Sequence, residues 1–463
     1  MADSQHIVLV SSPGRCKPDG AYHATPPEGL ARLVSWLQAR GRRVSVVDSL
    51  IEGHSERRPD GASMRYGLSG AEVSRRVAAL QPDLIGLSCP FTCTAPDVLE
   101  IAKLCRRERP QTPILLGGPH AALNAESILL QEPSVDYVAL GEGEVTLAAL
   151  ADELRPGGDP ERAPGLAVRT GSGVTRRAMP GLIDLDSLPR PAWDLFDLDA
   201  YARAAAPHSG LGSGRRFVPI TISRGCRRSC AYCASPQFWG RGQLRTRSPT
   251  SVLDEIAWLV SAFGVEEIHL EDDCLLADKE WFLDVLGALA DSTIALRLEL
   301  PNGLDASRMD SRTAALLARA GITRVHLSFE AGPVEVRRHG MSRRLTRDVA
   351  LAAVRALQEH GLSVRGYFML GFPGQTVSDM DATVDFALSL GLDDLALFIV
   401  TPFPGTPLHE SCRREGWLVD ADRLIDFRLS VGHIRTADFG PEDTERLRRA
   451  GWEAFHAGRH RER

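Results

Sequence analysis

The sequence predicts an α/β protein built from two successive series of βα units. The first observation is that short apolar runs alternate with helical patterns over residues 1–155. The second is a similar alternation that begins at Phe217 and gives six strand candidates. The third is that polar and glycine-rich segments directly follow most of these strands. Repeated βα units favour parallel sheets wrapped by helices, with ligands at the carboxyl ends of the strands.

Composition narrows the class of protein. The chain has 463 residues, 43% of them hydrophobic and 25% charged, which is typical of a globular enzyme and too long for one ordinary core. A net charge of −6 gives no reason to expect nucleic acid as a partner. The first residues lack a signal-peptide pattern, and no run approaches the roughly 20 apolar residues of a membrane span. We therefore expect no membrane or nucleic-acid partner.

The nine cysteines indicate the compartment. Apart from one trio they are scattered, which does not resemble a disulfide framework. Free thiols persist where the redox environment is reducing, so the sequence predicts a cytoplasmic protein.

A Rossmann-like domain is predicted for residues 1–155. Its strands are expected at 6–10, 43–47, 83–88, 113–116 and 136–140, and its helices at 28–40, 70–80, 95–107, 125–130 and 144–154.

Four loops at the carboxyl ends of these strands are rich in small residues. Glycine and proline in one such loop would simply end a strand, but four such loops at one edge favour a binding edge that a large ligand can approach. The candidate binding residues are Ser11, Ser88, Thr94, Gly117, Gly118, His120, Gly141 and Glu142.

Residues 156–207 are rich in Gly, Pro and Arg and are predicted to form an inter-domain connection, packed through Trp193 and Phe196. Residues 208–405 are predicted to form a partial barrel of six βα units, and residues 406–463 a short C-terminal extension. The barrel strands are expected at 217–223, 267–271, 295–300, 324–329, 364–370 and 395–400, and the helices at 250–263, 279–289, 307–320, 346–360 and 378–390.

Three cysteines, Cys226, Cys230 and Cys233, fall within eight residues after the first barrel strand. Thiolates packed this closely hold a metal or a cluster. A structural zinc normally needs four ligands, and residues 209–267 contain no other Cys and no His. Three ligands without a fourth favour a cluster with one open iron. The alternative is a zinc site completed from afar, with Cys274 as the best candidate.

Polar groups also follow the other barrel strands. The acidic run from Glu271 to Asp273 follows the second strand, Asn302 the third and Glu330 the fourth, while glycine–proline turns follow the fifth and sixth. Any one carboxylate could be an ordinary helix N-cap. Their recurrence at one end of a barrel favours an active site.

The motif Cys226-x3-Cys230-x-Tyr232-Cys233 resembles that of the radical S-adenosylmethionine (SAM) enzymes. The resemblance implies a [4Fe–4S] cluster on the three cysteines, with SAM on the open iron. An external donor of flavodoxin or ferredoxin type supplies one electron, and SAM is cleaved to a 5′-deoxyadenosyl radical that abstracts a substrate hydrogen.

The resemblance also implies roles for single residues. Tyr232 would lie near the adenine, and Gly366 and Gly371 belong to the strand motif that packs beside it. Cys274 is a candidate hydrogen donor to a product radical, with a small buried apolar role as its alternative. The remaining implied SAM contacts are Glu271, Asp272 and Asp273, which replace the commoner Gly-Gly-Glu form, together with Glu330 and Arg344 (or Arg343), the last with an exposed helix-start arginine as its alternative.

The first domain resembles the cobalamin-binding domain fused ahead of many radical SAM enzymes. The segments that carry the likeness are 83–88, 115–120 and 136–144, with later landmarks at 191–196 and 239–249. The Asp-x-His-x-x-Gly signature that supplies a histidine to cobalt elsewhere is absent. Family members without it include proteins that bind cobalamin and proteins that do not.

This class most often transfers methyl groups, so we expect cobalamin-dependent C-methylation of a small natural-product-type substrate, as in antibiotic biosynthesis. The short segment after Gly405 agrees with a small substrate. The alternative is cobalamin-independent dehydration or dehydrogenation of a sugar or aminoglycoside carbinol, as in related radical SAM dehydratases.

Overall fold

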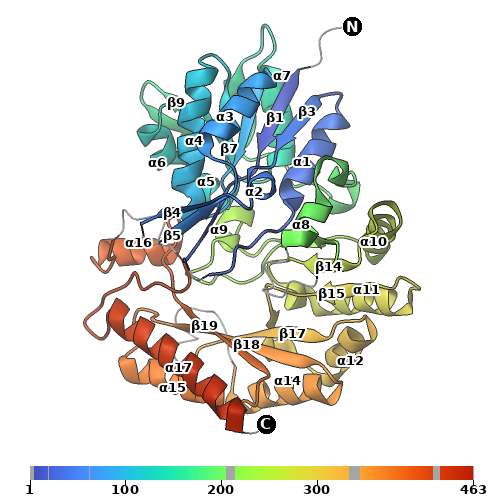
Figure 1. Cartoon of the computed structure of the whole chain (residues 1–463), viewed down its shortest axis with the longest axis vertical. Helices are drawn as coiled ribbons and strands as arrows, with labels where there is room; N and C mark the ends of the chain where they lie inside the picture. The colour runs from blue at the N-terminus through green and yellow to red at the C-terminus, as the bar shows by residue number, and fades with distance from the viewer. Residues whose placement is uncertain are drawn as a thin grey trace. The chain divides into compact units, whose positions relative to one another are not determined.

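A computed structural model describes residues 5–18, 20–61, 63–204, 214–332, 345–420 and 428–461 (Figure 1). The chain divides into two compact units, the first ending at Pro219 and the second beginning at Ile220. None of the helices in the described ranges combines the length and the apolarity needed to cross a membrane.

The first unit is built on a seven-stranded sheet with the order β10-β9-β8-β7-β6-β1-β3. The strands β3, β1, β6, β7 and β8 are parallel, and β9 and β10 are added antiparallel. Helix α1 packs beside α7, and α3 beside α4. The predicted Rossmann-like arrangement is therefore confirmed. The bounds are β1 His6–Val10, β3 Arg43–Val47, β6 Leu84–Ser88, β7 Ile114–Gly117, β8 Tyr137–Ala139, β9 Leu166–Thr170, β10 Gly173–Arg176, α1 Glu28–Gln38, α2 Ser49–Glu52, α3 Gly70–Ala79, α4 Ala95–Glu108, α5 Pro119–Leu123, α6 Ala125–Gln131 and α7 Gly143–Glu153.

The strand order places a switch point between β1 and β6. The chain leaves β1 towards β3 on one side of the sheet, and β6, β7 and β8 follow on the other. In open parallel sheets the crevice for a ligand lies outside the carboxyl ends of the strands at such a point. The loops after β1 and β6 are therefore the ones that a ligand of this sheet approaches.

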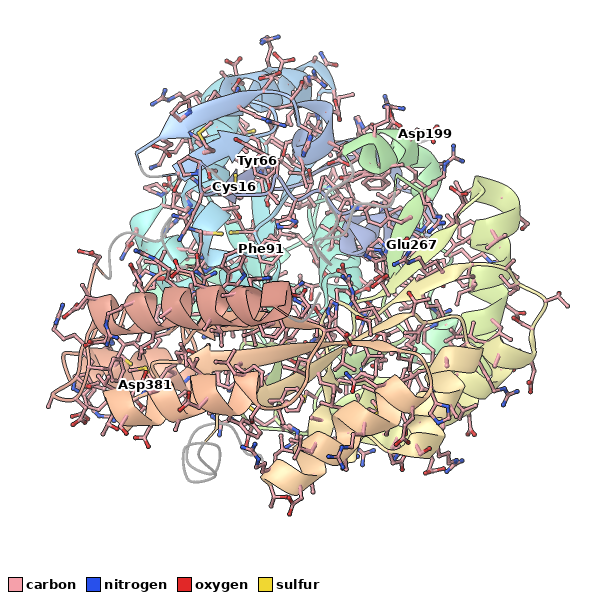
Figure 2. The ribbon with its side chains drawn as sticks, turned by 60° about the horizontal axis from the view of Figure 1, so that its bottom comes forward. Cys16, Tyr66, Phe91, Asp199, Glu267 and Asp381 are labelled. Atoms are coloured by element: carbon pink, nitrogen blue, oxygen red, sulfur yellow. The ribbon has the colours of Figure 1, made fainter. Side chains whose placement is uncertain are left out.

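Two pieces of the first unit were not predicted. The β9–β10 hairpin lies in the stretch assigned to the connection, and it extends the sheet instead. A second, antiparallel sheet joins β2 (Gly14–Cys16), β5 (Ser63–Tyr66) and β4 (Arg57–Asp60). These strands are short and polar, so they carry no apolar run. Figure 2 shows two of their residues, Cys16 and Tyr66, close together.

Buried ion pairs stabilise this small sheet beside its few buried apolar side chains, such as Tyr66. Arg15 of β2 has only 2% of its side chain exposed, and it pairs with Asp60 at 2.6 Å and with the buried Asp97 of α4. Arg65 of β5 pairs with the same Asp97 at 2.6 Å. Breaking one partner of a buried pair is costly because it leaves a charge without compensation.

A buried polar network fixes helix α8 (Leu198–Ala204) to the first unit. The Tyr201 hydroxyl donates to Asp48 Oδ2 at 2.7 Å, and the Ser11 hydroxyl donates to Asp48 Oδ1 at 2.8 Å. Burial raises the pKa of Asp48, and the bonds from Tyr201 and Ser11 oppose that rise. Trp193 and Phe196, the predicted anchors of the connection, are both buried.

We predict that Tyr201→Phe lowers the free energy of unfolding by about 1–3 kcal/mol, because it leaves a buried acceptor on Asp48 with one donor fewer. Tyr137→Phe is the matched control, since no hydrogen bond of the Tyr137 hydroxyl is recorded in the described structure. Urea denaturation of both variants checks the difference. Equal loss in both would show that the Tyr201 bond contributes nothing specific.

The second unit is a partial barrel, as predicted. Its strands form the sheets β11-β14-β15 and β16-β17-β18-β19, which a parallel bridge between Leu298 and Ile322 brings together. Helices alternate with the strands along the chain. The bounds are β11 Phe217–Ile220, β14 Glu267–Leu270, β15 Arg297–Glu299, β16 Leu304–Asp305, β17 Arg324–Glu330, β18 Ser363–Leu370, β19 Asp394–Ile399, α10 Pro249–Phe263, α11 Lys279–Asp291, α12 Ser311–Arg319, α14 Arg347–Glu359, α15 Val377–Leu388, α16 Pro407–Arg414 and α17 Pro441–Arg461.

The two faces of the barrel strands differ in chemistry. Phe329 of β17 stacks on Phe368 of β18 with ring centroids 5.1 Å apart, and both meet Phe386 of α15 edge-on. This aromatic cluster joins the sheet to its helix. Residues that alternate with it, such as His326 and Tyr367, are polar and lie on the other face.

Candidate functional site

The cysteine loop begins at the end of a two-stranded hairpin. Strand β12 (Ser223–Gly225) pairs with β13 (Leu244–Thr246), and Cys226 follows β12 directly. Gly225 has φ of +99°, and a Cβ there would lie 2.2 Å from the Gln243 carbonyl oxygen. Only glycine fits both the left-handed backbone and this close approach. Gly225 therefore fixes the direction in which the loop leaves the hairpin.

Asp272 is hydrogen-bonded to the start of the same hairpin. Its side chain is buried, and Oδ1 accepts hydrogen bonds from the Ile222 amide at 3.1 Å and from the Ser223 hydroxyl at 2.6 Å. The Ser223 amide donates to the same oxygen. Asp272 was predicted as a SAM contact, and the structure gives its carboxylate a positioning role for the strand that delivers Cys226.

The residues between the cysteines are tied to the barrel as well. Arg228 pairs with the buried Asp305 of β16, and Arg227 pairs with Asp278 at 3.3 Å. The amide of Leu408, in the first turn of α16, donates to Ala231 O at 2.9 Å. The loop is thus held at both ends and along its length.

The thiols lie in a mostly buried environment. Cys226 and Cys230 are buried, and Cys233 is partly exposed. A hydrogen bond with the Cys274 thiol lowers the pKa of Cys226, and the Arg228 amide adds a bond to its Sγ at 3.4 Å. Cys274 packs with Cys226 in a small buried cluster. Cys412, in α16, is completely buried, as a small apolar residue would be.

This donor set fits an iron–sulfur cluster. In the described part of the chain, no three His, Cys, Asp or Glu side chains gather as they would around a single ion. Each cysteine of a cubane cluster binds a different iron, so its thiolates need not meet at one point. The lowered pKa brings Cys226 closer to the thiolate form that binds metal, whereas burial raises the pKa of Cys233 to about 12, so the pKa shifts do not favour the thiolate at every position.

Several predicted SAM contacts lie around an aromatic pair. Tyr232 meets Phe372 edge-on, with ring centroids 6.3 Å apart. Phe372 belongs to the turn after β18, where the amides of Gly371 and Phe372 donate to Gln375 Oε1 at 2.9 and 2.7 Å. Gly371 has φ of +88°. Sequence reasoning missed Phe372 and the buried Gln375, because only the fold shows that this turn packs against the cysteine loop.

Glu330 has an unusual backbone. Glu330 is the last residue of β17, it is buried, and its φ is +72°. The pairing of β17 with β18 shifts register between Ser328 and Glu330. A left-handed conformation costs energy for a non-glycine residue and is concentrated at functional sites. The backbone strain supports a functional role for Glu330, and nothing in the sequence indicated that strain.

Other predicted residues have different surroundings. Gly366 lies in the core, where a Cβ would come within 2.5 Å of Leu392 Cδ1, so packing alone explains this glycine. Asp273 is an exposed residue whose carboxyl group faces protein: burial of that group raises its pKa, and interactions with the side chains of Ser235 and Trp239 and with the Gly225 amide oppose the rise. The Glu271 amide donates to Ile220 O at 3.2 Å, which extends the pairing of β14 with β11. Arg344 lies outside the described residues.

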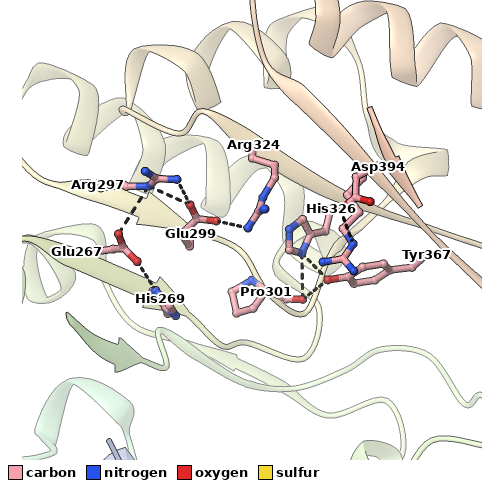
Figure 3. A network of polar contacts seen from close by, with 10 residues as sticks. Glu267, His269, Arg297, Glu299, Pro301, Arg324, His326, Tyr367 and Asp394 are labelled. Atoms are coloured by element: carbon pink, nitrogen blue, oxygen red, sulfur yellow. Dashed lines mark hydrogen bonds and ion pairs between the residues drawn. The ribbon is translucent and has the colours of Figure 1, made fainter. Parts of the chain in front are cut away.

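The interior face of the barrel carries a buried polar network (Figure 3). Glu267 bonds to His269 at 2.7 Å, and Glu299 accepts from Arg297 at 2.8 Å and from Arg324 at 3.4 Å. Further along the network, the Tyr367 hydroxyl lies 2.9 Å from Pro301 O and close to His326 Nδ1. Barrel interiors are usually filled by branched apolar side chains. This interior is polar instead.

The carboxyl edge of the first unit is open at Gly117, where a Cβ would meet no atom within 4 Å. Gly118 is needed for a different reason: its φ is +104°, and a Cβ there would lie 3.0 Å from the backbone of Cys89. Phe91, in the loop after β6, is 63% exposed. A Cβ on Gly141 would lie 2.4 Å from Met179, which is itself half exposed. Bare backbone and exposed apolar side chains at one edge fit a large, flat ligand.

The polar residues of this edge are mostly engaged within the protein. Ser11 serves the Asp48 network, and the Thr94 hydroxyl donates to Phe91 O at 3.3 Å. Ser88 is partly exposed and Glu142 is buried. His120 Nδ1 lies 3.0 Å from the Thr92 hydroxyl.

Comparison with protein families decides the class. The model of the radical SAM superfamily matches residues 220–387, and that of the B12-binding domain matches residues 21–151. The chain therefore carries a B12-binding domain followed by a domain of the radical SAM superfamily. The first match lies within the second unit, and the second lies within the first unit. A radical SAM domain implies a [4Fe–4S] cluster and SAM, and a B12-binding domain implies cobalamin.

Several proteins are similar to this chain over most of its length. Cytidylyl-2-hydroxyethylphosphonate methyltransferase of Streptomyces wedmorensis is 27% identical over 443 residues, covering 89% of this chain and 82% of that protein. TsrM from Kitasatospora setae, a radical SAM methyltransferase solved with cobalamin and a [4Fe–4S] cluster, superposes with a TM-score of 0.71 at 20% identity, covering 89% and 78% of the two chains. OxsB, solved with aqua-cobalamin and SAM, gives 0.75 at 16% identity over 97% and 66%. The two structures show the same fold.

We predict that Asp272→Asn lowers the free energy of unfolding by about 1–3 kcal/mol, because an amide offers one acceptor oxygen and turns an N–H2 towards buried donors. The variant should also retain less iron after anaerobic reconstitution than the wild type. Asp284→Asn, at an exposed carboxylate of α11 in the same unit, should keep both stability and iron. Iron analysis and denaturation curves measure the two effects. Full iron retention by Asp272→Asn would contradict the positioning role.

Proposed function

We propose that the chain is a cobalamin-dependent radical SAM methyltransferase that acts on a small-molecule substrate. The observation that carries the proposal is the combination of two sites in one chain. One is a constrained loop of three cysteines beside an aromatic pair, and the other is an open, glycine-lined edge on a B12-binding domain. One relative found by sequence and one found by structure are both methyltransferases, which supports methyl transfer as the reaction.

Cys226, Cys230 and Cys233 would hold the cluster, and the loops after β1, β6, β7 and β8 would hold cobalamin. When bound, the cluster supplies the electron that cleaves SAM, and cobalamin supplies the metal centre for methyl transfer. An external one-electron donor of flavodoxin or ferredoxin type belongs to the proposal, because the cluster must be reduced before it can supply the electron. A reducing cytoplasm belongs to it as well, because free thiols persist there. The cobalamin-binding domain would extend to the end of the β9–β10 hairpin.

The chain's own residues position these groups and exclude water. Gly225 and Asp272 set the course of the cysteine loop, so that the thiolates are arranged before a ligand arrives. Tyr232 and Phe372 offer an aromatic surface on which an adenine can pack. Glu330, in its strained conformation, is a fixed acceptor at the end of β17.

The polar network of Figure 3 does not bear on the substrate. Glu267, Arg297 and Arg324 are the first residues of β14, β15 and β17, and their side chains are paired within the network. A paired network at the amino ends of barrel strands contributes to stability, whereas the site lies at the carboxyl ends. The small-molecule substrate in the proposal rests on the methyltransferase relatives. No observation favours dehydration or dehydrogenation over methyl transfer.

The products of SAM test this function. We expect protein reconstituted anaerobically with iron, sulfide and hydroxocobalamin to keep cobalamin through gel filtration. With SAM and a reductant it should form both 5′-deoxyadenosine and S-adenosylhomocysteine, since radical formation and methyl supply each consume one SAM. Absorption spectra and chromatography measure cobalamin and the two nucleosides.

Protein that retains no cobalamin, or that forms 5′-deoxyadenosine alone, would contradict methyl transfer from cobalt. The control is the variant with alanine at Cys226, Cys230 and Cys233, which should keep cobalamin but form no 5′-deoxyadenosine. Formation of 5′-deoxyadenosine by that variant would contradict the assignment of the cluster.

A further inference from the structure

His120 lies at the open edge of the first unit. It follows the turn of Gly117, Gly118 and Pro119 at the carboxyl end of β7, and only 7% of it is exposed. The signature that delivers a cobalt-binding histidine in other cobalamin proteins is absent from the sequence. The chain nevertheless places an imidazole close to Gly117, where the edge is open. The protonation and the tautomer of the His120 ring therefore decide whether it can donate a hydrogen bond to a ligand there or coordinate a metal.

Two neighbours fix the tautomer of this imidazole. Asn124 Nδ2 donates to the His120 carbonyl oxygen at 2.8 Å and also lies 3.3 Å from His120 Nδ1. The bond to the carbonyl identifies this atom as the amide nitrogen, which can only donate. Nδ1 must then accept, and the Thr92 hydroxyl at 3.0 Å can donate to it as well. In the neutral ring the proton therefore belongs to Nε2.

The ring is neutral, and its Nε2 is accessible. Burial lowers the pKa of His120 to about 4, so the imidazole carries one proton at physiological pH. Both recorded side-chain contacts of His120 are made by Nδ1. Nε2 is also not among the described side-chain atoms that are fully buried without a partner. The Nε2–H group therefore keeps some solvent exposure.

An imidazole in this state is a hydrogen-bond donor and a poor metal ligand. Coordination through Nε2 would require the ring to move its proton to Nδ1. That nitrogen faces the Asn124 amide group, which would then oppose it donor to donor. Histidines that do bind metals through Nε2 usually have an acceptor beside Nδ1 instead. The surroundings of His120 are the reverse of that arrangement.

We propose that His120 binds cobalamin as a hydrogen-bond donor through Nε2–H, to an oxygen acceptor of the cofactor's amide or phosphate groups, and that it does not coordinate cobalt. The inference rests on the proposed binding of cobalamin at this edge. It assigns to the chain a cofactor-binding residue whose tautomer is set by Asn124 and Thr92.

The first test measures affinity for hydroxocobalamin by absorption titration. His120→Phe removes the donor and should raise the dissociation constant about tenfold, as expected for the loss of one hydrogen bond. His120→Gln keeps an N–H donor at a similar reach and should stay within about threefold of wild type. His360→Phe, an exposed histidine of the second unit, is the matched control and should change nothing. Thermal unfolding and iron content establish that each variant is folded.

The second test is the electron paramagnetic resonance spectrum of the protein loaded with cob(II)alamin. We expect the cobalt signal to be the same whether histidine carries ¹⁴N or ¹⁵N. Nitrogen splitting that changes with the isotope and disappears in His120→Phe would overturn the inference, because it would show coordination. Affinity of His120→Phe equal to wild type would overturn it as well. Failure of wild-type protein to bind cobalamin would instead contradict the proposed function itself.

Discussion

The active-site region depends on one buried carboxylate. Asp272 lies at the end of β14 and accepts hydrogen bonds from the backbone and side chain at the start of β12, which leads into the cysteine loop. A buried charge is costly unless donors compensate it, and here the donors belong to the strand that must be held in place. The Asn302 side chain also donates to the Asp272 carbonyl oxygen at 3.2 Å. Consecutive barrel strands are thereby coupled to the position of Cys226.

The first unit achieves its binding edge by different means. Its sheet reverses strand order between β1 and β6, so the loops at that point diverge and leave room beyond the strand ends. Gly117 keeps a side chain out of that room, while buried networks such as that of Asp48 hold the neighbouring loops. An open backbone over a rigid support suits a large, preformed cofactor.

Most of the fold could be predicted from the sequence. The main strands are buried apolar runs bounded by glycine or polar residues. These patterns can be recognised in the sequence without knowing which strands pair with each other. The three cysteines were equally visible, because their spacing alone limits the chemistry. The small sheet of β2, β4 and β5 was not visible, since ion pairs such as that of Arg15 with Asp97 stabilise it and depend on residues far apart in sequence. The β9–β10 hairpin was hidden in a stretch rich in glycine and proline.

The roles of single site residues were harder to predict. Gly366 matched a cofactor motif, yet the core around Leu392 explains it. Asp272 was expected to face SAM, and its hydrogen bonds show it holding β12. The left-handed backbone of Glu330 and the contact of Tyr232 with Phe372 have no counterpart in local sequence. Each depends on which segments the barrel brings together, and spacing along the chain does not report that.

The central claim is that three thiolates hold a cluster whose remaining iron is left open for SAM. The electron paramagnetic resonance spectrum of the reduced, reconstituted protein tests it most directly, recorded with and without SAM. Binding of SAM to the open iron should change the g values of the [4Fe–4S]⁺ signal. A spectrum that SAM leaves unchanged, or protein that takes up zinc in place of iron, would contradict the account.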